Sequence, residues 1–498
     1  MANRKIYNKP NIGISGLGNL FNKPNILADK QGSSVTFFFT PDLTTCVLAR
    51  KVLAKTVLVK MVEKAVSAAS RLLLIVLITW SVCGNTQPLQ LVYSGNLDGE
   101  LEPCGCTEEG NLGGIKRRVT VFDKLRAEYP DLVAISAGGL ISAEGSTDQI
   151  KAKYILKGFT ELKYDAIGMQ WKDLSYGIQF LIGDNIPWVV SNWEHEGILK
   201  EKLISRRQGD KTVNIKVFSW LDPEFSPLRQ MHGDHTMVSD NAAQINADIA
   251  QADAAGDITV LLTALPLEAV KDRFDLKAVD ILFVRASYEV FAEPLKEGKT
   301  VVLQPGSRGM RIASLGLEVD KAGNIADWTH KVIPLPSNVA DSPRMAKWYA
   351  AYNDEVKQDY LKRVEIRKQM ESGASNFAGE QACKTCHVAE HKKWMDSQHA
   401  IAYEDLESVN KAFDPACIVC HTVGFGQPGG FVDMSLTPHL LNVQCENCHG
   451  AAREHAESKG VKPVPNRDWP KEKICGQCHV QKHSPSFSLE KYWPKIAH

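Results

Sequence analysis

The C-terminal quarter of this chain repeats one cysteine–histidine motif four times. Each copy has two cysteines separated by two residues, followed at once by a histidine. This spacing suits covalent haem attachment, because the thiols form thioethers with the haem vinyl groups and the histidine reaches the iron. Zinc ribbons also pair cysteines in this way, but they do not require a histidine after every pair. The sequence therefore predicts four covalently bound haem c groups. The motif residues are Cys383, Cys386, His387, Cys417, Cys420, His421, Cys445, Cys448, His449, Cys475, Cys478 and His479.

Six further histidines lie among these motifs and are candidates for the second axial position of the irons. A lone histidine is most often a polar surface residue, but six of them beside four irons favour ligation. Imidazole on both sides of an iron gives an electron-transfer haem, whereas an empty sixth position leaves an iron that binds small ligands. We expect His391 to be a surface residue on a helix. The other five are His399, His439, His455, His483 and His498.

Residues 377–498 resemble the tetrahaem cytochrome c family that accepts electrons from hydroxylamine oxidation in nitrifying bacteria. The matching segments are FAGEQACKTCH, WMDSQHAIAYEDL, CENCHGAAREH, CGQCH and the terminal YWPKIAH. The resemblance implies a mainly α-helical multihaem domain. It also implies that His399 serves the haem of His449, and that His455 serves the haem of His387.

The same resemblance leaves two axial positions open. A C-terminal histidine serves the fourth haem, that of His479; we expect His498, with His483 as the competitor. The second haem, that of His421, is five-coordinate in some relatives. In this chain either His439 fills its sixth position or no residue does.

Residues 85–337 alternate short β-rich runs with helical stretches, which predicts an α/β fold. This segment resembles the N-terminal domain of 5′-nucleotidases and related dinuclear metallophosphoesterases. NLDGELEP, YDAIGMQWKDLSYG, IPWVVSNW and VDILFVRASYE stand where that family has its metal-site motifs. The resemblance implies a layered β-sandwich with flanking helices.

Most of the metal ligands implied by that resemblance are replaced. Asn96 and Asp98 are the oxygen donors that remain, and Lys172 adds a cation where the family places a metal. A pair of metals that activates water needs a bridging carboxylate and several histidine or aspartate ligands. Phosphoesterase activity is therefore not expected. The positions without a ligand are Gly139, Trp171, Lys172, Ala264, Ala286 and Tyr288.

Cys104 and Cys106 flank a single glycine within this segment. An i,i+2 pair rarely closes an unstrained disulfide. Three interpretations compete: a strained redox-active disulfide, a dithiolate that binds a soft metal or persulfide, and two unrelated thiols. Idle thiols are a liability in an oxidising compartment, which favours a functional redox pair. His232 and His235 also have ligand-like spacing, although a solvated turn is the favoured interpretation.

Residues 61–84 have the layout of a secretory signal. A segment carrying Lys64 and Arg71 precedes the apolar run LLLIVLITW, which is too short to span a bilayer comfortably. This signal predicts a periplasmic or otherwise exported protein; lipidation at Cys83 and an uncleaved membrane anchor are the alternatives. Residues 1–60 show no periodic apolar face, and we expect a disordered extension or a mis-assigned start.

Five segments result: 1–60, the signal at 61–84, the α/β domain at 85–337, a helical connector at 338–373 and the haem domain at 374–498. In the connector, apolar residues recur at three- and four-residue spacing after Ser342, which predicts a helix that docks on one domain or forms a coiled-coil dimer. Lys and Arg together equal Asp and Glu at 58 each, so no net charge points to nucleic acid. We expect an electron-transfer protein with a redox partner protein or a small-molecule donor or acceptor. A haem enzyme acting on a small nitrogen or sulfur compound is the alternative, and phosphoester hydrolysis ranks last.

Overall fold

The computed structural model describes residues 87–104, 111–225, 238–285, 291–370, 375–481, 483–484 and 486–498. The chain divides into two compact units, residues 1–84 and 85–498, and every described residue belongs to the second. The predicted extension and signal therefore lie outside the described residues, as do Cys106, His232 and His235. Among the helices that are described, none is long and apolar enough to cross a membrane.

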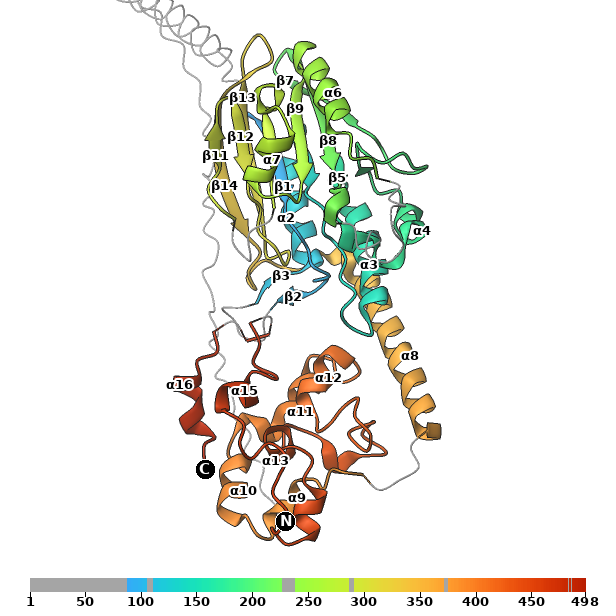
Figure 1. Cartoon of the computed structure of the whole chain (residues 1–498), viewed down its shortest axis with the longest axis vertical. Helices are drawn as coiled ribbons and strands as arrows, with labels where there is room; N and C mark the ends of the chain where they lie inside the picture. The colour runs from blue at the N-terminus through green and yellow to red at the C-terminus, as the bar shows by residue number, and fades with distance from the viewer. Residues whose placement is uncertain are drawn as a thin grey trace, which may run out of the picture. The chain divides into compact units, whose positions relative to one another are not determined.

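Two six-stranded sheets form the centre of the α/β part (Figure 1). The first sheet has the order β14-β13-β1-β4-β5-β6, in which β1 pairs parallel to β4 and antiparallel to β13. The second has the order β11-β12-β10-β9-β8-β7. Their bounds are β1 Leu89–Ser94, β4 Val133–Ser136, β5 Ala166–Gly168, β6 Trp188–Val189, β7 Lys202–Gln208, β8 Lys211–Trp220, β9 Ile258–Thr263, β10 Ile281–Phe283, β11 Leu295–Glu297, β12 Thr300–Leu303, β13 Arg311–Val319 and β14 Ile325–Pro334.

The alternation of side chains along the strands fixes the layers. In β1, Leu91 and Tyr93 join a buried cluster shared with the second sheet, whereas Val92 joins the cluster that contains the helices of the opposite face. Successive strand residues point to opposite faces, so each buried strand contributes to two cores. The predicted layered α/β sandwich with flanking helices is confirmed.

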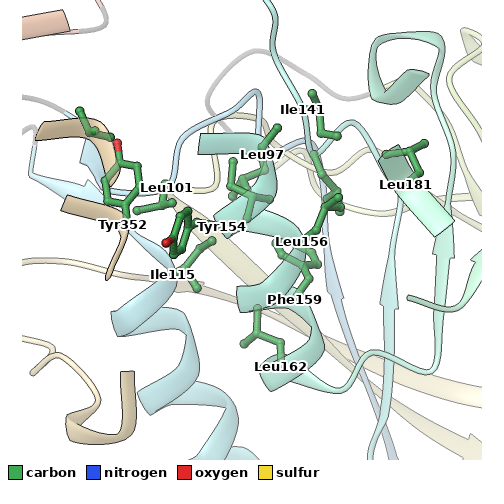
Figure 2. Close-up of a cluster of buried hydrophobic side chains, with 14 of the residues drawn as sticks. Leu97, Leu101, Ile115, Ile141, Tyr154, Leu156, Phe159, Leu162, Leu181 and Tyr352 are labelled. Atoms are coloured by element: carbon green, nitrogen blue, oxygen red, sulfur yellow. The ribbon is translucent and has the colours of Figure 1, made fainter. Parts of the chain in front are cut away.

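Helices cover the outer face of each sheet. On the first sheet lie α2 (Ile115–Glu128) and α3 (Asp148–Leu162), whose apolar residues include Ile115 and Phe159. Figure 2 shows these side chains clustered with Leu97, Leu156 and Tyr352. On the second sheet lie α6 (Ala242–Ala254) and α7 (Leu267–Arg273). A separate two-stranded sheet joins β2 (Pro103–Cys104) to β3 (Leu112–Gly113).

The connector is a helix whose apolar face is buried. It begins as a 3₁₀ turn, Pro343–Met345, and continues as α8, Ala346–Met370. Ser342 precedes the first turn, but its side chain makes no capping hydrogen bond. Tyr352 and Val356 are fully buried in a core that also contains residues from α3 and from the haem-domain segment. The helix therefore contacts both neighbouring parts of the chain rather than one.

The C-terminal part, from residue 375 onward, consists of short helices and turns. Its buried apolar residues include Ile418, Val423, Phe431 and Leu440, which belong to the same cluster as the connector. This mainly helical architecture confirms the predicted fold class. The helices are α9 Glu380–Lys384, α10 Val388–Met395, α11 Ala402–Ser408, α12 Pro415–His421, α13 Cys445–His449, α14 Arg453–Glu457, α15 Lys471–Cys475 and α16 Leu489–Tyr492.

Truncating the connector at its buried face is expected to destabilise the protein. Val356→Ala removes apolar volume at a position with 0% exposure, and should lower the free energy of unfolding by about 2 kcal/mol. Ile366→Ala, at a position on the same helix with 49% exposure, is the control and should change it by about 0.5 kcal/mol or less. Guanidinium unfolding followed by circular dichroism measures both values; equal losses would contradict the packing described.

Candidate haem sites and the implied metal site

Each cysteine–histidine motif lies on a helical turn. The second and third motifs fall within α12 and α13. In the first and fourth, the histidine amide donates to the carbonyl of the first cysteine: His387 to Cys383 and His479 to Cys475, both at 2.9 Å. Residues i, i+3 and i+4 share one face of a helix, so both thiols and the imidazole lie on the same side of each turn. None of the eight motif cysteines forms a disulfide. This arrangement fits covalent attachment of haem c.

Three motif histidines face a second imidazole from a distant part of the chain. A first-row metal ion binds histidine nitrogen at about 2 Å, so two imidazoles on opposite sides of one ion have ring centroids about 6 Å apart. The observed spacings match this requirement. The centroid distances are 6.2 Å for His387 and His455, 6.2 Å for His399 and His479, and 5.9 Å for His449 and His498.

Hydrogen bonds at Nδ1 orient several of these rings. His421 donates from Nδ1 to the carbonyl of Ala402 at 2.5 Å, and His455 donates to that of Lys462 at 2.6 Å. His498 donates to the carbonyl of Ile496 at 2.9 Å. A proton held at Nδ1 leaves Nε2 with its lone pair, which is the atom that binds a metal.

Burial keeps three of the imidazoles in the form that binds metals. Loss of solvent lowers the pKa of His399, His449 and His479 below the usual value for histidine. These side chains are therefore neutral at pH 7, and neutral imidazole is the metal-binding form.

Thiols from different motifs meet in pairs. Cys478 hydrogen-bonds Cys420 and lowers its pKa to about 7, while the pKa of Cys478 is raised. Cys383 and Cys445 interact in the same way. The first attachment turn therefore adjoins the third, and the second adjoins the fourth.

Two of the histidine pairs differ from those that the sequence resemblance implied. His387 lies beside His455 as expected. His399, however, lies beside His479 rather than His449, and His498 lies beside His449 rather than His479. The contact between the second and fourth turns explains the first difference. The carbonyl of Ala402, three residues after His399, accepts from His421, and this holds the segment against the second turn, which adjoins the fourth.

The other candidate histidines lie elsewhere. The three imidazole pairs above do not include His421, whose charge acts on His399. His439 is exposed, and its ring lies against Gly379, four residues before the first motif. The neighbouring Leu440 accepts from the amide of Val423, two residues after the second motif. His483 is half-buried. His391 is buried, and its Nε2 bonds to Glu380, so the expectation that it is a surface residue was wrong.

In the α/β part, an ion pair occupies the position of the implied metals. Lys172 Nζ contacts Asp98 Oδ1, and the other oxygen of Asp98 accepts from the amide of Arg308 at 3.0 Å. The amide oxygen of Asn96 accepts from Gln170 Nε2 at 2.7 Å. Both oxygen donors that remain are thus satisfied by protein groups.

Gly139 stands where the related enzymes have a metal-ligating aspartate, and the space for that side chain is filled. A Cβ at Gly139 would lie 2.8 Å from Asn96 Cγ and 2.8 Å from Lys172 Cε. Among the described residues, no group of three or more His, Cys, Asp or Glu side chains is placed to hold a metal ion. Ala286 and Tyr288 lie outside the described residues, and only the backbone of Cys104 is described.

Asp173 is a buried residue that the sequence interpretation missed. Its carboxylate accepts amide hydrogen bonds from Gly139 at 2.8 Å, Leu140 at 2.6 Å, Ile141 at 3.2 Å and Gln170 at 2.9 Å. Burial raises its pKa, and these bonds oppose the shift. The residue holds the loop after β4 in place. The available signal was the acidic residue three positions after Gln170, which completes a capping box.

Known proteins match the two parts of the chain separately. Residues 382–450 match the family described as cytochrome c554 and c-prime. Cytochrome c-554 of Nitrosomonas europaea is 36% identical over 135 residues, covering 21% of this chain and 57% of the relative. The chain thus spans little more than half the length of that relative. The C-terminal part is similar to this family of c-type cytochromes, as its sequence indicated.

Solved structures similar to the α/β part include three hydrolases. A 5′-nucleotidase precursor from Thermus thermophilus has a TM-score of 0.46 and 17% identity, covering 54% of this chain and 59% of that chain. The sulfate thiohydrolase SoxB, also from Thermus thermophilus, has a TM-score of 0.46 and 14% identity, with coverages of 56% and 62%. The calcineurin-like phosphoesterase YfkN of Bacillus subtilis has a TM-score of 0.43 and 16% identity, with coverages of 54% and 97%.

The ion pair at Asp98 predicts that the α/β part neither binds catalytic metals nor hydrolyses phosphoesters. The ammonium of Lys172 already neutralises Asp98, and two-metal hydrolysis needs several further ligands. Elemental analysis of the purified protein should show iron but no stoichiometric manganese, zinc or nickel. Incubation with bis-p-nitrophenyl phosphate and added Mn²⁺ should give no turnover. Stoichiometric metal together with turnover would overturn this interpretation.

Proposed function

We propose that the C-terminal part binds four haem c groups covalently and that the protein functions in electron transfer. The observation that carries this proposal is the set of three imidazole pairs, spaced at 5.9–6.2 Å, each of which includes a motif histidine. A single pair could arise from local packing. Each of the three pairs has the spacing of two imidazoles that share one metal ion, and each lies beside the two cysteines of a motif. Binding of a haem iron at each pair accounts for all three.

In this proposal two histidines would hold each of three irons. The ligands are His387 with His455, His449 with His498, and His479 with His399. Haem supplies reversible one-electron chemistry when bound. The protein's own contribution is to orient the imidazoles and to keep them neutral, as the Nδ1 hydrogen bonds and the lowered pKa values indicate.

A second candidate function rests on His421. Its Nδ1 donates to the carbonyl of Ala402, and it belongs to none of the three imidazole pairs. An iron held there would keep an open position, which suits binding of a small molecule. This observation favours a haem enzyme acting on a small nitrogen or sulfur compound as the alternative to pure electron transfer.

We assign the α/β part to partner binding, with redox chemistry at Cys104 and Cys106 as the competing role. The ion pair of Lys172 with Asp98 supports the loss of hydrolysis. Covalent haem attachment requires export, so we propose a periplasmic or otherwise exported protein. Its partner would be a redox protein or a small-molecule electron donor or acceptor.

Removing a distal imidazole should convert one haem from six- to five-coordinate. His399→Ala in the haem-loaded protein is expected to add one high-spin signal to the electron paramagnetic resonance spectrum, because the ring facing His479 is lost. His439→Ala is the matched control, since this exposed histidine belongs to none of the three imidazole pairs, and its spectrum should equal that of the parent. An altered spectrum in His439→Ala, or an unaltered one in His399→Ala, would contradict the assignment.

The open position at His421 predicts stoichiometric binding of carbon monoxide. The fully reduced protein should bind about one molecule per four haems, because the other three irons carry two imidazoles. Titration followed by the haem absorption spectrum gives the ratio. If the reduced protein binds no carbon monoxide, the result would support electron transfer alone and would exclude the enzyme alternative.

A further inference from the structure

Lys411 is a buried cation at the junction of the α/β part and the second attachment turn. Only 8% of the residue is exposed. Its Nζ donates to Glu102 Oε2 at 2.8 Å and to Asn353 Oδ1 at 2.8 Å. Glu102 belongs to the loop after β1, whereas Asn353 lies on the connector helix α8. One side chain thus links three parts of the chain that are distant in sequence.

Asp414 connects this cation to the second motif. Its carboxylate lies 3.6 Å from Lys411 Nζ and accepts from the amide of Ala416 at 3.0 Å. It is therefore the N-cap of α12, the helix that carries Cys417, Cys420 and His421. Asp414 therefore links Lys411 directly to the helix that carries the haem attachment residues.

Aromatic rings shield the cluster from water. Lys411 Nζ lies 5.5 Å from the ring centroid of Tyr349 and 5.2 Å from that of Tyr352. The hydroxyl of Tyr349 donates to Glu102. Tyr352 is fully buried, and the charges of Glu102 and Asp414 act on it together with the Cys417 thiol. Charges in such a setting are screened less than surface charges, so they act at longer range.

Stability alone gives a weak reason for this cluster. Removing charges from water costs several kcal/mol per ion, and apolar residues in the place of a buried ion pair are often as stable or more so. A cation placed near a redox centre has another effect. It favours the reduced state, because the added electron is attracted to the positive charge, and a nearby carboxylate has the opposite effect.

We propose that Lys411 raises the reduction potential of the haem attached at Cys417 and Cys420, and that Glu102 lowers it. The α/β part thereby tunes this haem through one side chain of the loop after β1. The inference rests on the proposed haem site at the second motif. The electron gained by that iron is the one that the redox partner loses, and Lys411 changes only how strongly it is held. Lys411 acts through its charge alone and contacts no reacting atom.

The test compares two neutralising substitutions with opposite charge change in the haem-loaded protein. Lys411→Met should lower the potential of one haem component, and Glu102→Gln should raise the same component. A tenfold change in a one-electron equilibrium constant corresponds to about 59 mV, and we expect shifts of that size. Lys357→Met is the control, because this lysine is exposed on α8 and lines the same pocket as Tyr349 and Asn353. Its titration curve should equal that of the parent.

Spectroelectrochemical titration gives the reduction potentials. If Lys411 and Glu102 only stabilised the fold, the two substitutions would not shift the potential in opposite directions. Shifts in the same direction, or none in either variant, would overturn the inference. If Lys411→Met yields no folded protein, Glu102→Gln alone tests the proposal. A lowered or unchanged reduction potential in this variant would contradict it. Failure of the underlying haem assignment is seen separately. Mass spectrometry would then show the peptide with Cys417 and Cys420 without haem in the parent protein.

Discussion

The spacing between paired imidazoles is the constraint on which the C-terminal part depends. Each motif brings two thiols and one imidazole on a single turn, and the opposing imidazole must come from elsewhere. Short contacts position these opposing residues: the amide of Val443 bonds to the carbonyl of His399 at 3.2 Å, and the amide of Gly460 bonds to that of His455 at 2.9 Å. Because the helices are short, such loop contacts determine the site more than helix packing does.

The loop after β1 is held at both ends by lysine side chains. Asp98 and Gly99 have positive φ angles of 56° and 75°, which form the tight turn of this loop. One end of the loop is held by Lys172 through Asp98, and the other end reaches Lys411 through Glu102. Two lysines thus balance acidic groups of the loop. The second of these contacts joins the α/β part to the haem-bearing part.

The features that could be predicted from the sequence are local ones. The four attachment turns follow from spacing that fits within one helical turn, and the cation beside Asp98 follows from the replacement at Lys172. The pairing of His399 with His479 spans most of the domain, and no local pattern reveals which turns lie opposite each other. His391 was misplaced because its partner, Glu380, is not an i,i+4 neighbour. Lys411 carried no sequence signal, since its burial depends on three separate segments.

The connector helix explains why the two parts are best regarded as one folded unit. Tyr360, 6% exposed, donates from its hydroxyl to the carbonyl of Val432 at 2.9 Å, and Tyr352 is packed against α3 through Tyr154 at 5.6 Å between ring centroids. One face of α8 is therefore covered by segments from both sides. Deleting either part would expose large apolar side chains and leave Lys411 or Glu102 without its partner. Charge changes at single residues of the intact chain therefore separate function from folding more cleanly than truncation does.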